Sequence, residues 1–162
     1  MFDSTSSPTT FNLKSFNSDL SSLTDGHRMF YHCNIASFNG DLSSLTDGEK
    51  MFQGSNLKSF SSDLSSLTKG DYMFTGCTAL TSFTSDLSSL FVGRYMFSYC
   101  KNLASFSSDL SRLTHGTGMF YGCTALTSFT SGLSGMFDGN NMFEKCNSLT
   151  SFSSSLTNVS HG

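Results

Sequence analysis

Apolar residues recur along this chain at fixed positions, separated by serine, threonine and glycine. One copy of the pattern, residues 80–100, is LTSFTSDLSSLFVGRYMFSYC, and similar copies precede and follow it. A Met-Phe pair marks each copy, and successive pairs are 22, 22, 23, 23 and 23 residues apart: Met29-Phe30, Met51-Phe52, Met73-Phe74, Met96-Phe97, Met119-Phe120 and Met142-Phe143. A period in this range is the signature of a solenoid, in which each repeat stacks on its neighbours.

The copies divide the chain into rungs that start at residues 13, 35, 57, 80, 103, 126 and 149. Residues 1–12 match no repeat, and we expect them to form a cap over the first rung. The change from 22 to 23 residues occurs between the cysteine column and the next leucine, where a corner tolerates an added residue. The sequence therefore predicts a right-handed, leucine-rich-repeat-like solenoid of about seven rungs over residues 13–162.

Within a rung the pattern predicts three short segments. The first, residues 80–84, is a strand with Leu80 and Phe83 pointing inward, and stacked strands of this kind form a parallel sheet. The second, residues 86–90, has two leucines three apart and is predicted as another short strand. The third, residues 96–100, is predicted as one turn of α- or 3₁₀-helix with Phe97 and Cys100 inward. Thirteen phenylalanines fall in two columns, so we expect them to form the core.

A glycine ends the second segment in every rung: Gly26, Gly48, Gly70, Gly93, Gly116, Gly139 and Gly162. A glycine kept at one corner predicts either a positive φ angle or an approach too close for a Cβ atom.

Charge and composition exclude several classes of protein. Nine Lys and Arg stand against twelve Asp and Glu, so the chain lacks the basic stripe that nucleic-acid binding requires. No apolar run approaches the length of a membrane span, and we expect no membrane insertion. The first residues lack the basic and apolar regions of a secretory signal. Three interpretations stay open: the chain begins after processing, it is exported by another route, or it stays inside the cell.

Five cysteines share one column, and Ser55 fills the same position in the remaining rung: Cys33, Cys77, Cys100, Cys123 and Cys146. A disulfide framework needs pairs at differing spacings, and zinc sites use CxxC spacing, which is absent. Replacement by serine indicates a site for a small side chain, so we expect buried free thiols. An oxidised neighbouring pair and a metal site are the alternatives.

These segments resemble the repeats of the BspA-like, treponemal-type leucine-rich repeat family. Its units carry L-x-x-I, V-x-x-I-G and A-F-x-x-C-x-x-L elements in about 23 residues. Residues 80–83, 87–90 and 96–100 match them, with methionine in place of the usual alanine. The chain departs from the family at Ser85-Asp86, where an apolar residue and proline are common. The resemblance implies a surface protein of bacteria, phages or protist parasites, often used in adhesion. No catalytic constellation stands out from the repeated residues, so we expect a non-enzymatic protein without a cofactor.

Two outer columns are uniform. The first strands carry outward Ser and Thr side chains, which we interpret as a solvated face, with binding of a regular lattice (ice or polysaccharide) as the alternative. Five aspartates form the second column: Asp19, Asp41, Asp63, Asp86 and Asp109. Each is expected to accept a backbone N–H bond at its own corner, as in an Asx-turn. A row of bound calcium ions is the alternative.

The variable positions lie around the Met-Phe turn, where all five tyrosines occur. Tyr and Arg are typical of interaction surfaces. We therefore predict a contact surface for a protein or glycan partner here, with ordinary corner variation as the alternative: Arg28, Tyr31, His32, Tyr72, Arg94, Tyr95, Tyr99, Lys101, Tyr121 and Lys145. The four histidines are expected to lie on the surface, without a metal or a catalytic role.

A last set of apolar residues suggests self-assembly. Phe91 and Phe137 replace the Thr or Ser of their column, and the last rung ends the sequence without an evident polar cap. Head-to-tail stacking into an oligomer or fibre would cover such surfaces. The predicted assembly residues are Phe91, Phe137, Leu149, Phe152, Leu156 and Val159. The alternative is that the sequence is part of a longer array.

Overall fold

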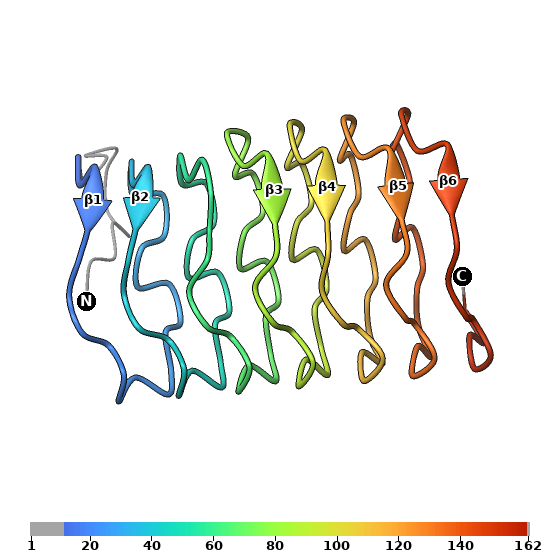
Figure 1. The fold of residues 1–162 in the computed structure, drawn as a ribbon, viewed down its shortest axis with the longest axis horizontal. Helices are drawn as coiled ribbons and strands as arrows, with labels where there is room; N and C mark the ends of the chain where they lie inside the picture. Colours follow the sequence, from blue (N-terminus) through green and yellow to red (C-terminus); the bar gives the residue numbers. More distant parts are fainter. Residues whose placement is uncertain (1–11, 162) are drawn as a thin grey trace.

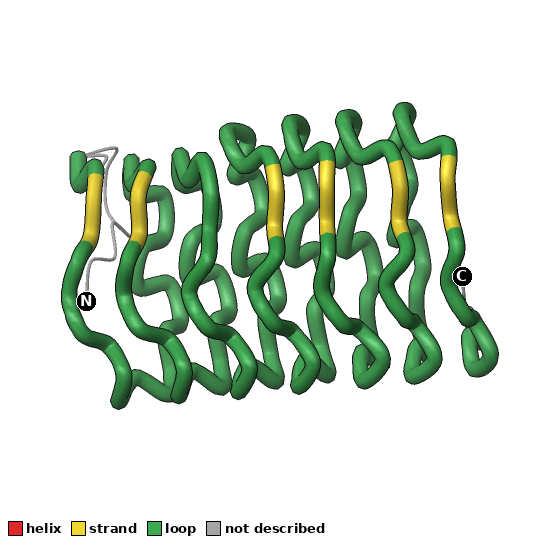
Figure 2. The backbone as a smooth tube through the Cα atoms, viewed as in Figure 1, coloured by secondary structure: helices red, strands yellow, loops and turns green. Residues whose placement is uncertain are grey.

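The fold is a row of similar turns of chain stacked along one axis. In the computed structural model, which describes residues 12–161, successive rungs lie side by side and their short strands line one face (Figure 1). The strands are β1 (Ser15–Phe16), β2 (Ser37–Phe38), β3 (Ser82–Phe83), β4 (Ser105–Phe106), β5 (Ser128–Phe129) and β6 (Ser151–Phe152). Everything else in residues 12–161 is turn or loop (Figure 2). The predicted cap at residues 1–12 lies outside the described residues except for Asn12.

The strands pair in parallel, with each residue opposite its equivalent one repeat away. Ser15 pairs with Ser37, Ser82 with Ser105 and Ser128 with Ser151. The strands form three two-stranded sheets, β1–β2, β3–β4 and β5–β6. The rung that starts at residue 57 contains no strand, although its Lys58 is bonded to both neighbours, to Ala36 and to Thr81, at 3.4 Å. The predicted parallel stacking is therefore confirmed, with strands shorter than expected.

A second ladder runs through the stack without interruption. Single parallel bridges join the residue before the corner glycine of each rung to its equivalent in the next: Asp25, Asp47, Lys69, Val92, His115, Asp138 and His161. These bridges include the rung that lacks a strand, so every neighbouring pair of rungs is hydrogen-bonded along this line.

The predicted second strand is wrong. Residues 86–90 form a turn, in which the Leu90 N–H donates to the Leu87 carbonyl at 2.9 Å. The Asp86 carboxylate accepts the N–H of Ser88 at 2.8 Å and holds the chain in this turn. Leu87 and Leu90 both point into the core, as the spacing predicted. Two apolar residues three positions apart fit a turn as well as a strand. The hydrogen bond to the preceding aspartate favours the turn.

The predicted helical turn at the Met-Phe pair is also wrong. Its N–H groups alternate between two kinds of partner. In the first rung Met29, Tyr31 and Cys33 donate to the carbonyl three residues back, whereas Arg28 and Phe30 donate to carbonyls of the next rung. A helix would direct all of these bonds along its own axis. The stacked arrangement forms in place of a helix because every second N–H can donate to a carbonyl of the neighbouring rung.

Two files of phenylalanine rings fill the interior. Within each file successive rings are stacked, with centroids 5.3–6.0 Å apart and planes within 4–14°. Between the files the rings meet edge to face, at 4.7–5.5 Å and 64–79°. Both arrangements are favoured by aromatic quadrupoles. The predicted phenylalanine core is confirmed.

Close approach, and not positive φ, explains the corner glycines from Gly26 to Gly116, whereas a Cβ on Gly139 would meet nothing closer than 3.6 Å. A Cβ on Gly26 would lie 2.7 Å from the Met51 sulfur, and one on Gly48 would lie 2.8 Å from that of Met73. At Gly26, Gly48 and Gly70 the methionine of the next rung's Met-Phe pair thus packs over the glycine, whereas at Gly116 this contact comes from Met136. None of these corner glycines has a positive φ angle.

Candidate functional site

Two columns of residues around the Met-Phe pair adopt a left-handed backbone. In each rung the residue before the methionine and the second residue after the phenylalanine have positive φ angles, as at Tyr72 (59°), Gly76 (73°), Tyr95 (54°) and Tyr99 (59°). Each of these residues is the third of a four-residue turn that is closed by a hydrogen bond, as in Gly26 to Met29. A type II turn requires a positive φ angle at its third residue, which glycine and asparagine adopt most readily. The first left-handed column consists of Arg28, Lys50, Tyr72, Tyr95, Gly118 and Asn141, and the second of His32, Gly54, Gly76, Tyr99, Gly122 and Lys145.

Side chains of these columns extend along the stack toward the next rung. The Lys50 ammonium lies 5.3 Å from the centre of the Tyr72 ring, and the Tyr72 ring stacks on that of Tyr95 at 5.3 Å and 14°. The Tyr95 ring in turn lies over Gly118, which has no side chain to displace it. The rings of Tyr72 and Tyr95 therefore form a stacked aromatic surface along the rungs.

Four of the five tyrosines come together around one groove, which we call the tyrosine groove. Its volume is about 430 Å³, and its aromatic lining consists of Tyr72, Tyr95, Tyr99 and Tyr121. Its other lining residues are polar: Gln53, Thr75, Ser98, Asn141 and Glu144. Tyr99 is the most open of these rings, with 47% of its surface exposed, and it meets Tyr121 edge to face at 5.3 Å.

Lys145 closes one end of the aromatic row. Its ammonium lies 4.6 Å from the centre of the Tyr121 ring and donates a hydrogen bond to the Tyr121 hydroxyl. That hydrogen bond raises the pKa of the Lys145 ammonium, so the side chain stays charged. Glu144 lies 3.9 Å from the same ammonium, so a cation and an anion stand side by side at this end.

The other predicted contact residues lie outside the tyrosine groove. Arg28, Tyr31 and His32 form their own cluster on the first rung, with Arg28 5.7 Å above the Tyr31 ring and Tyr31 4.2 Å from His32. Arg94 is 3.6 Å from Asp71, and its backbone N–H also donates to that carboxylate. Lys101 is exposed on the corner that follows the cysteine column.

Sequence reasoning missed the polar lining of the groove. Gln53, Thr75, Ser98 and Glu144 occupy the column of Tyr121, while Asn141 occupies the column of Tyr72 and Tyr95. The sequence did contain a signal for these residues, because residues at equivalent positions of stacked repeats lie on the same surface. The columns alone place these residues on the same surface as the tyrosines, but they do not show that the side chains form a groove.

The predicted assembly residues separate into two places. Phe91 and Phe137 are each 50% exposed and alternate with His115 and His161 along one edge, at ring distances of 5.5–6.4 Å. Phe152 and Leu156 are 43% and 48% exposed on the last rung, beside the partly buried Leu149 and Val159. A hollow of about 120 Å³ lies on this last face, with an apolar lining that includes Met142, Phe143, Phe152, Leu156 and Val159.

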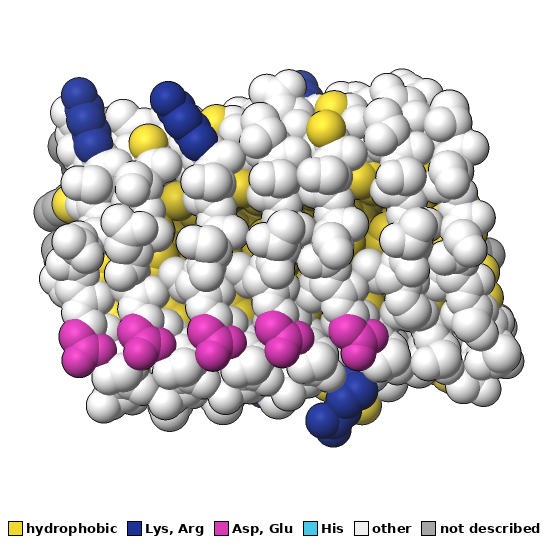
Figure 3. All heavy atoms as spheres, viewed as in Figure 1, with side chains coloured by type: hydrophobic (Ala, Val, Ile, Leu, Met, Phe, Trp, Pro, Cys, Tyr) yellow, Lys and Arg dark blue, Asp and Glu magenta, His cyan; other side chains and the backbone are white. Residues whose placement is uncertain are grey.

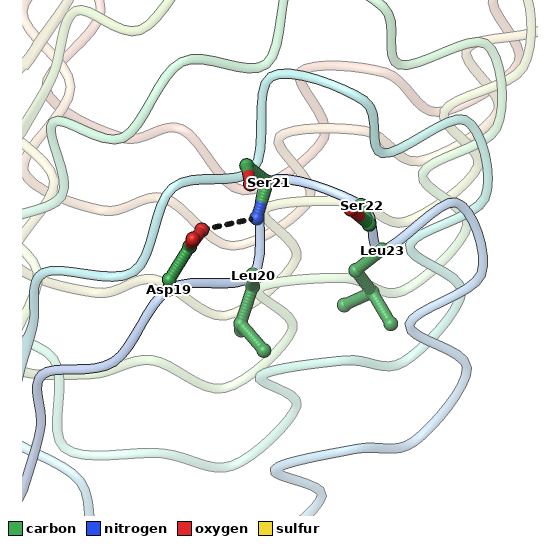
Figure 4. A pocket seen from close by; sticks show the side chains of 5 residues that line it. All are labelled: Asp19, Leu20, Ser21, Ser22 and Leu23. Atoms are coloured by element: carbon green, nitrogen blue, oxygen red, sulfur yellow. Dashed lines mark hydrogen bonds between the residues drawn. The ribbon is translucent and has the colours of Figure 1, made fainter.

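The predicted aspartate caps are confirmed. Each aspartate of the column accepts the N–H of the residue two positions later at 2.8–2.9 Å. Figure 4 shows this bond between Asp19 and Ser21, at an open hollow of the first rung, and the bond lowers the pKa of the Asp19 carboxyl. A row of acidic side chains crosses the face drawn in Figure 3, surrounded mostly by neutral polar groups. Lattice binding by this Ser and Thr face stays a prediction.

The cysteine column is buried and forms no disulfide, as expected. All five thiols are free and buried, and Ser55 occupies the equivalent position, 3.3 Å from the Cys77 sulfur. The Cys100 thiol donates to the Phe74 carbonyl, and its neighbours repeat that contact. Burial raises the pKa of the Cys77 thiol to about 12. Within residues 12–161 no three His, Cys, Asp or Glu side chains group as metal ligands, and no helix is long and apolar enough to cross a bilayer.

Stacked 22- and 23-residue rungs, in-register parallel strands and a continuous interior file of leucine, phenylalanine and cysteine define the class: a leucine-rich-repeat type of solenoid. The chain belongs to the BspA type leucine rich repeat family, whose model matches residues 2–104 and 46–161 in six copies. No curated protein and no solved structure matches the chain. Repeats of this family generally serve as modules for protein binding or adhesion, and they are generally non-catalytic.

Proposed function

We propose that this chain is a non-enzymatic, surface-exposed binding module, and that the tyrosine groove is where it contacts a protein or glycan partner. The convergence of four tyrosines from three successive rungs on one concave surface carries this proposal. Tyrosine supplies a large contact area at low conformational cost, together with a hydroxyl for hydrogen bonding. The outward positions of the strand segments carry serine, threonine and asparagine, and so offer no aromatic anchor.

The experiment compares two variants that keep the fold. Because equivalent positions accept one another's residues, the groove variant takes its substitutions from the same columns: Tyr72→Asn, Tyr95→Asn, Tyr99→Gly and Tyr121→Thr. The control variant changes four outward serines of the strand face to alanine: Ser59→Ala, Ser82→Ala, Ser105→Ala and Ser128→Ala.

Labelled protein is applied to arrays of purified extracellular proteins and of purified oligosaccharides. We expect the unchanged chain and the control variant to bind the same spots, and the groove variant to lose them. Equal binding by the groove variant, loss of binding in the control variant, or no binding of the unchanged chain to either array would overturn the proposal.

End-to-end assembly is a second candidate. The apolar hollow of the last rung, with Phe152 and Leu156 about half exposed, supports it. A rung stacked on this face, from the same chain or from a second copy, would cover these side chains. Sedimentation at several concentrations tests the idea with Phe152→Ser and Leu156→Ser as a double variant. A species that grows with concentration and reverts to a monomer in the variant supports assembly, and a strictly monomeric unchanged chain contradicts it.

A further inference from the structure

The tyrosine groove combines aromatic faces with polar hydrogen-bonding groups, of which only Glu144 carries a charge. Its lining contains four tyrosines and five polar residues, and no aliphatic side chain. A protein side chain that anchors an interface usually enters an apolar, fully desolvated pocket. This lining instead fits a ligand that has both C–H faces and many hydroxyl groups.

The ring of Tyr99, which is 47% exposed, is the one most open to a flat ligand. Tyr72 and Tyr95 are nearly parallel, at 14°, and Tyr99 and Tyr121 meet at 74° beside them. The face of an aromatic ring carries partial negative charge and its edge partial positive charge. The C–H groups on one side of a pyranose ring carry partial positive charge, so such a ring packs favourably on an exposed tyrosine face.

Polar groups are available beside these rings. The amide oxygen of Gln53 is buried without a hydrogen-bond partner, which is costly unless a ligand or water satisfies it. Asn141 and Glu144 are exposed at the other end of the groove. The exposed Asn141 amide and Glu144 carboxylate can bind hydroxyls directly, and the Gln53 amide can do so once its side chain turns toward the groove. The Thr75 hydroxyl is already used, because it donates to the Tyr95 carbonyl.

Two observations argue against other ligands. Backbone N–H groups beside the groove are already bonded between rungs, as in Gly54 to Thr75, Gly76 to Ser98 and Tyr99 to Tyr121, so a peptide cannot add as a strand. Two ammonium groups lie against lining tyrosines, and both are paired: Lys145 bonds to Tyr121 and lies 3.9 Å from Glu144, and Lys50 donates to Glu49 at 2.6 Å. An acidic polysaccharide would therefore meet the Glu144 carboxylate without a free cation in the lining.

We infer that the tyrosine groove binds a neutral oligosaccharide that lies along the stack. This inference rests on the proposed function and specifies its ligand class. The lining extends from Gln53 to Glu144 over four rung-to-rung steps, about 19 Å at the usual strand spacing. A site of this length takes several sugar residues in a row, so longer oligosaccharides bind more tightly than disaccharides of the same composition.

Tyrosine fluorescence provides a direct test. The chain has no tryptophan and five tyrosines, four of which line the groove, so a ligand there changes most of the intrinsic emission. The probes are neutral cello-, manno- and chito-oligosaccharides, with oligomers of hyaluronan and alginate as the acidic comparison. Calorimetry with the same probes measures affinity independently of the emission.

At least one neutral series should bind saturably, with affinity that rises with chain length. A Tyr72→Asn, Tyr95→Asn variant should bind at least about tenfold more weakly, equivalent to about 1.4 kcal/mol, while Ser82→Ala, Ser105→Ala leaves affinity unchanged. Circular dichroism and thermal unfolding of each variant check that the fold is retained.

Failure of every neutral probe, equal or tighter binding of the acidic probes, or binding that the groove variant leaves intact would overturn the inference. If proteins bind through the groove and neutral sugars do not, the inference fails and the proposed function stands. If neither class depends on the groove, both fail.

Discussion

The ring of Tyr95 lies directly over Gly118, the equivalent residue of the next rung, and leaves no room there for a Cβ atom. Gly118 thus does two things: it adopts a φ angle of 59° and it supports one ring of the tyrosine groove. Gly118→Ala should push the Tyr95 ring away and weaken ligand binding in the groove. Titration with whichever array ligand binds the unchanged chain measures this loss.

Gly76→Ala is the matched control for that change. Gly76 also has a positive φ angle, 73°, but a Cβ there would meet nothing closer than 3.9 Å. Both alanines cost about 1–2 kcal/mol in backbone strain, so thermal unfolding should shift similarly in the two variants. Only Gly118→Ala should change binding. Equal binding by the two would show that the position of the Tyr95 ring does not matter for the ligand.

The aspartate column makes a prediction about stability. The Asp63 carboxylate accepts the Ser65 N–H at 2.8 Å, so Asp63→Ala should lower the free energy of unfolding by about 0.5–2 kcal/mol, as loss of a comparable helix cap does. Asp63→Asn keeps an acceptor and removes one charge from a row of like charges. Urea unfolding should therefore place the asparagine variant at or slightly above the unchanged chain.

The same pair of variants tests the calcium alternative. A bound cation would need the charge, and then Asp63→Asn would destabilise as much as Asp63→Ala, and a chelator would lower the melting temperature of the unchanged chain. We expect no effect of chelator, because the aspartates bond to their own corners.

The repeat spacing alone predicted the stacking, because it shows which residues occupy equivalent positions in successive rungs. Once Phe52 and Phe74 are known to be one repeat apart, the stacked file of their rings follows. The free, buried cysteines were predictable for the same reason, since Ser55 showed what the position accepts. Local backbone conformation was not predictable in this way, and both the second strand and the helical turn were wrong.

The tyrosine groove depends on that local conformation. Lys50, Tyr72 and Tyr95 hold positive φ angles, although none of these residue types favours them. The signal lies in the glycines that share their columns, Gly118 in the first and Gly54, Gly76 and Gly122 in the second. Even with that signal, spacing alone did not give the direction of each side chain along the stack, which brings four of the tyrosines into one groove.

Position along the stack should set the cost of removing a phenylalanine. The Phe74 ring is fully buried and meets four others: Phe52, Phe60, Phe83 and Phe97. Phe74→Ala should lower the free energy of unfolding by about 3–5 kcal/mol. Phe152 meets only Phe129 and Phe143 within the described residues and is 43% exposed, so Phe152→Ala should cost less than half as much. Equal costs in urea unfolding would contradict a single stacked core.

The buried thiols predict a loss of stability at alkaline pH. Burial raises the pKa of the Cys77 thiol from 9.0 to about 12, and burial also raises the pKa of the Cys100 and Cys123 thiols. Below pH 9 each thiol keeps its proton in both the folded and the unfolded chain, so the stabilising effect is fully present. Between pH 9 and about 12 only the unfolded chain releases the proton of Cys77. Each such thiol then lowers the free energy of unfolding by about 1.4 kcal/mol per pH unit.

Cys77→Ser isolates this effect from the titration of lysines and tyrosines, which is common to both proteins. Serine is accepted in this column at Ser55, and a serine hydroxyl can donate to the Phe52 carbonyl as the thiol does now. Urea unfolding of the two proteins between pH 8 and pH 11 should give a shallower decline for the variant, by about 1.4 kcal/mol per pH unit above pH 9. Parallel declines would mean that the Cys77 thiol ionises in the folded chain, and so that water reaches the interior file.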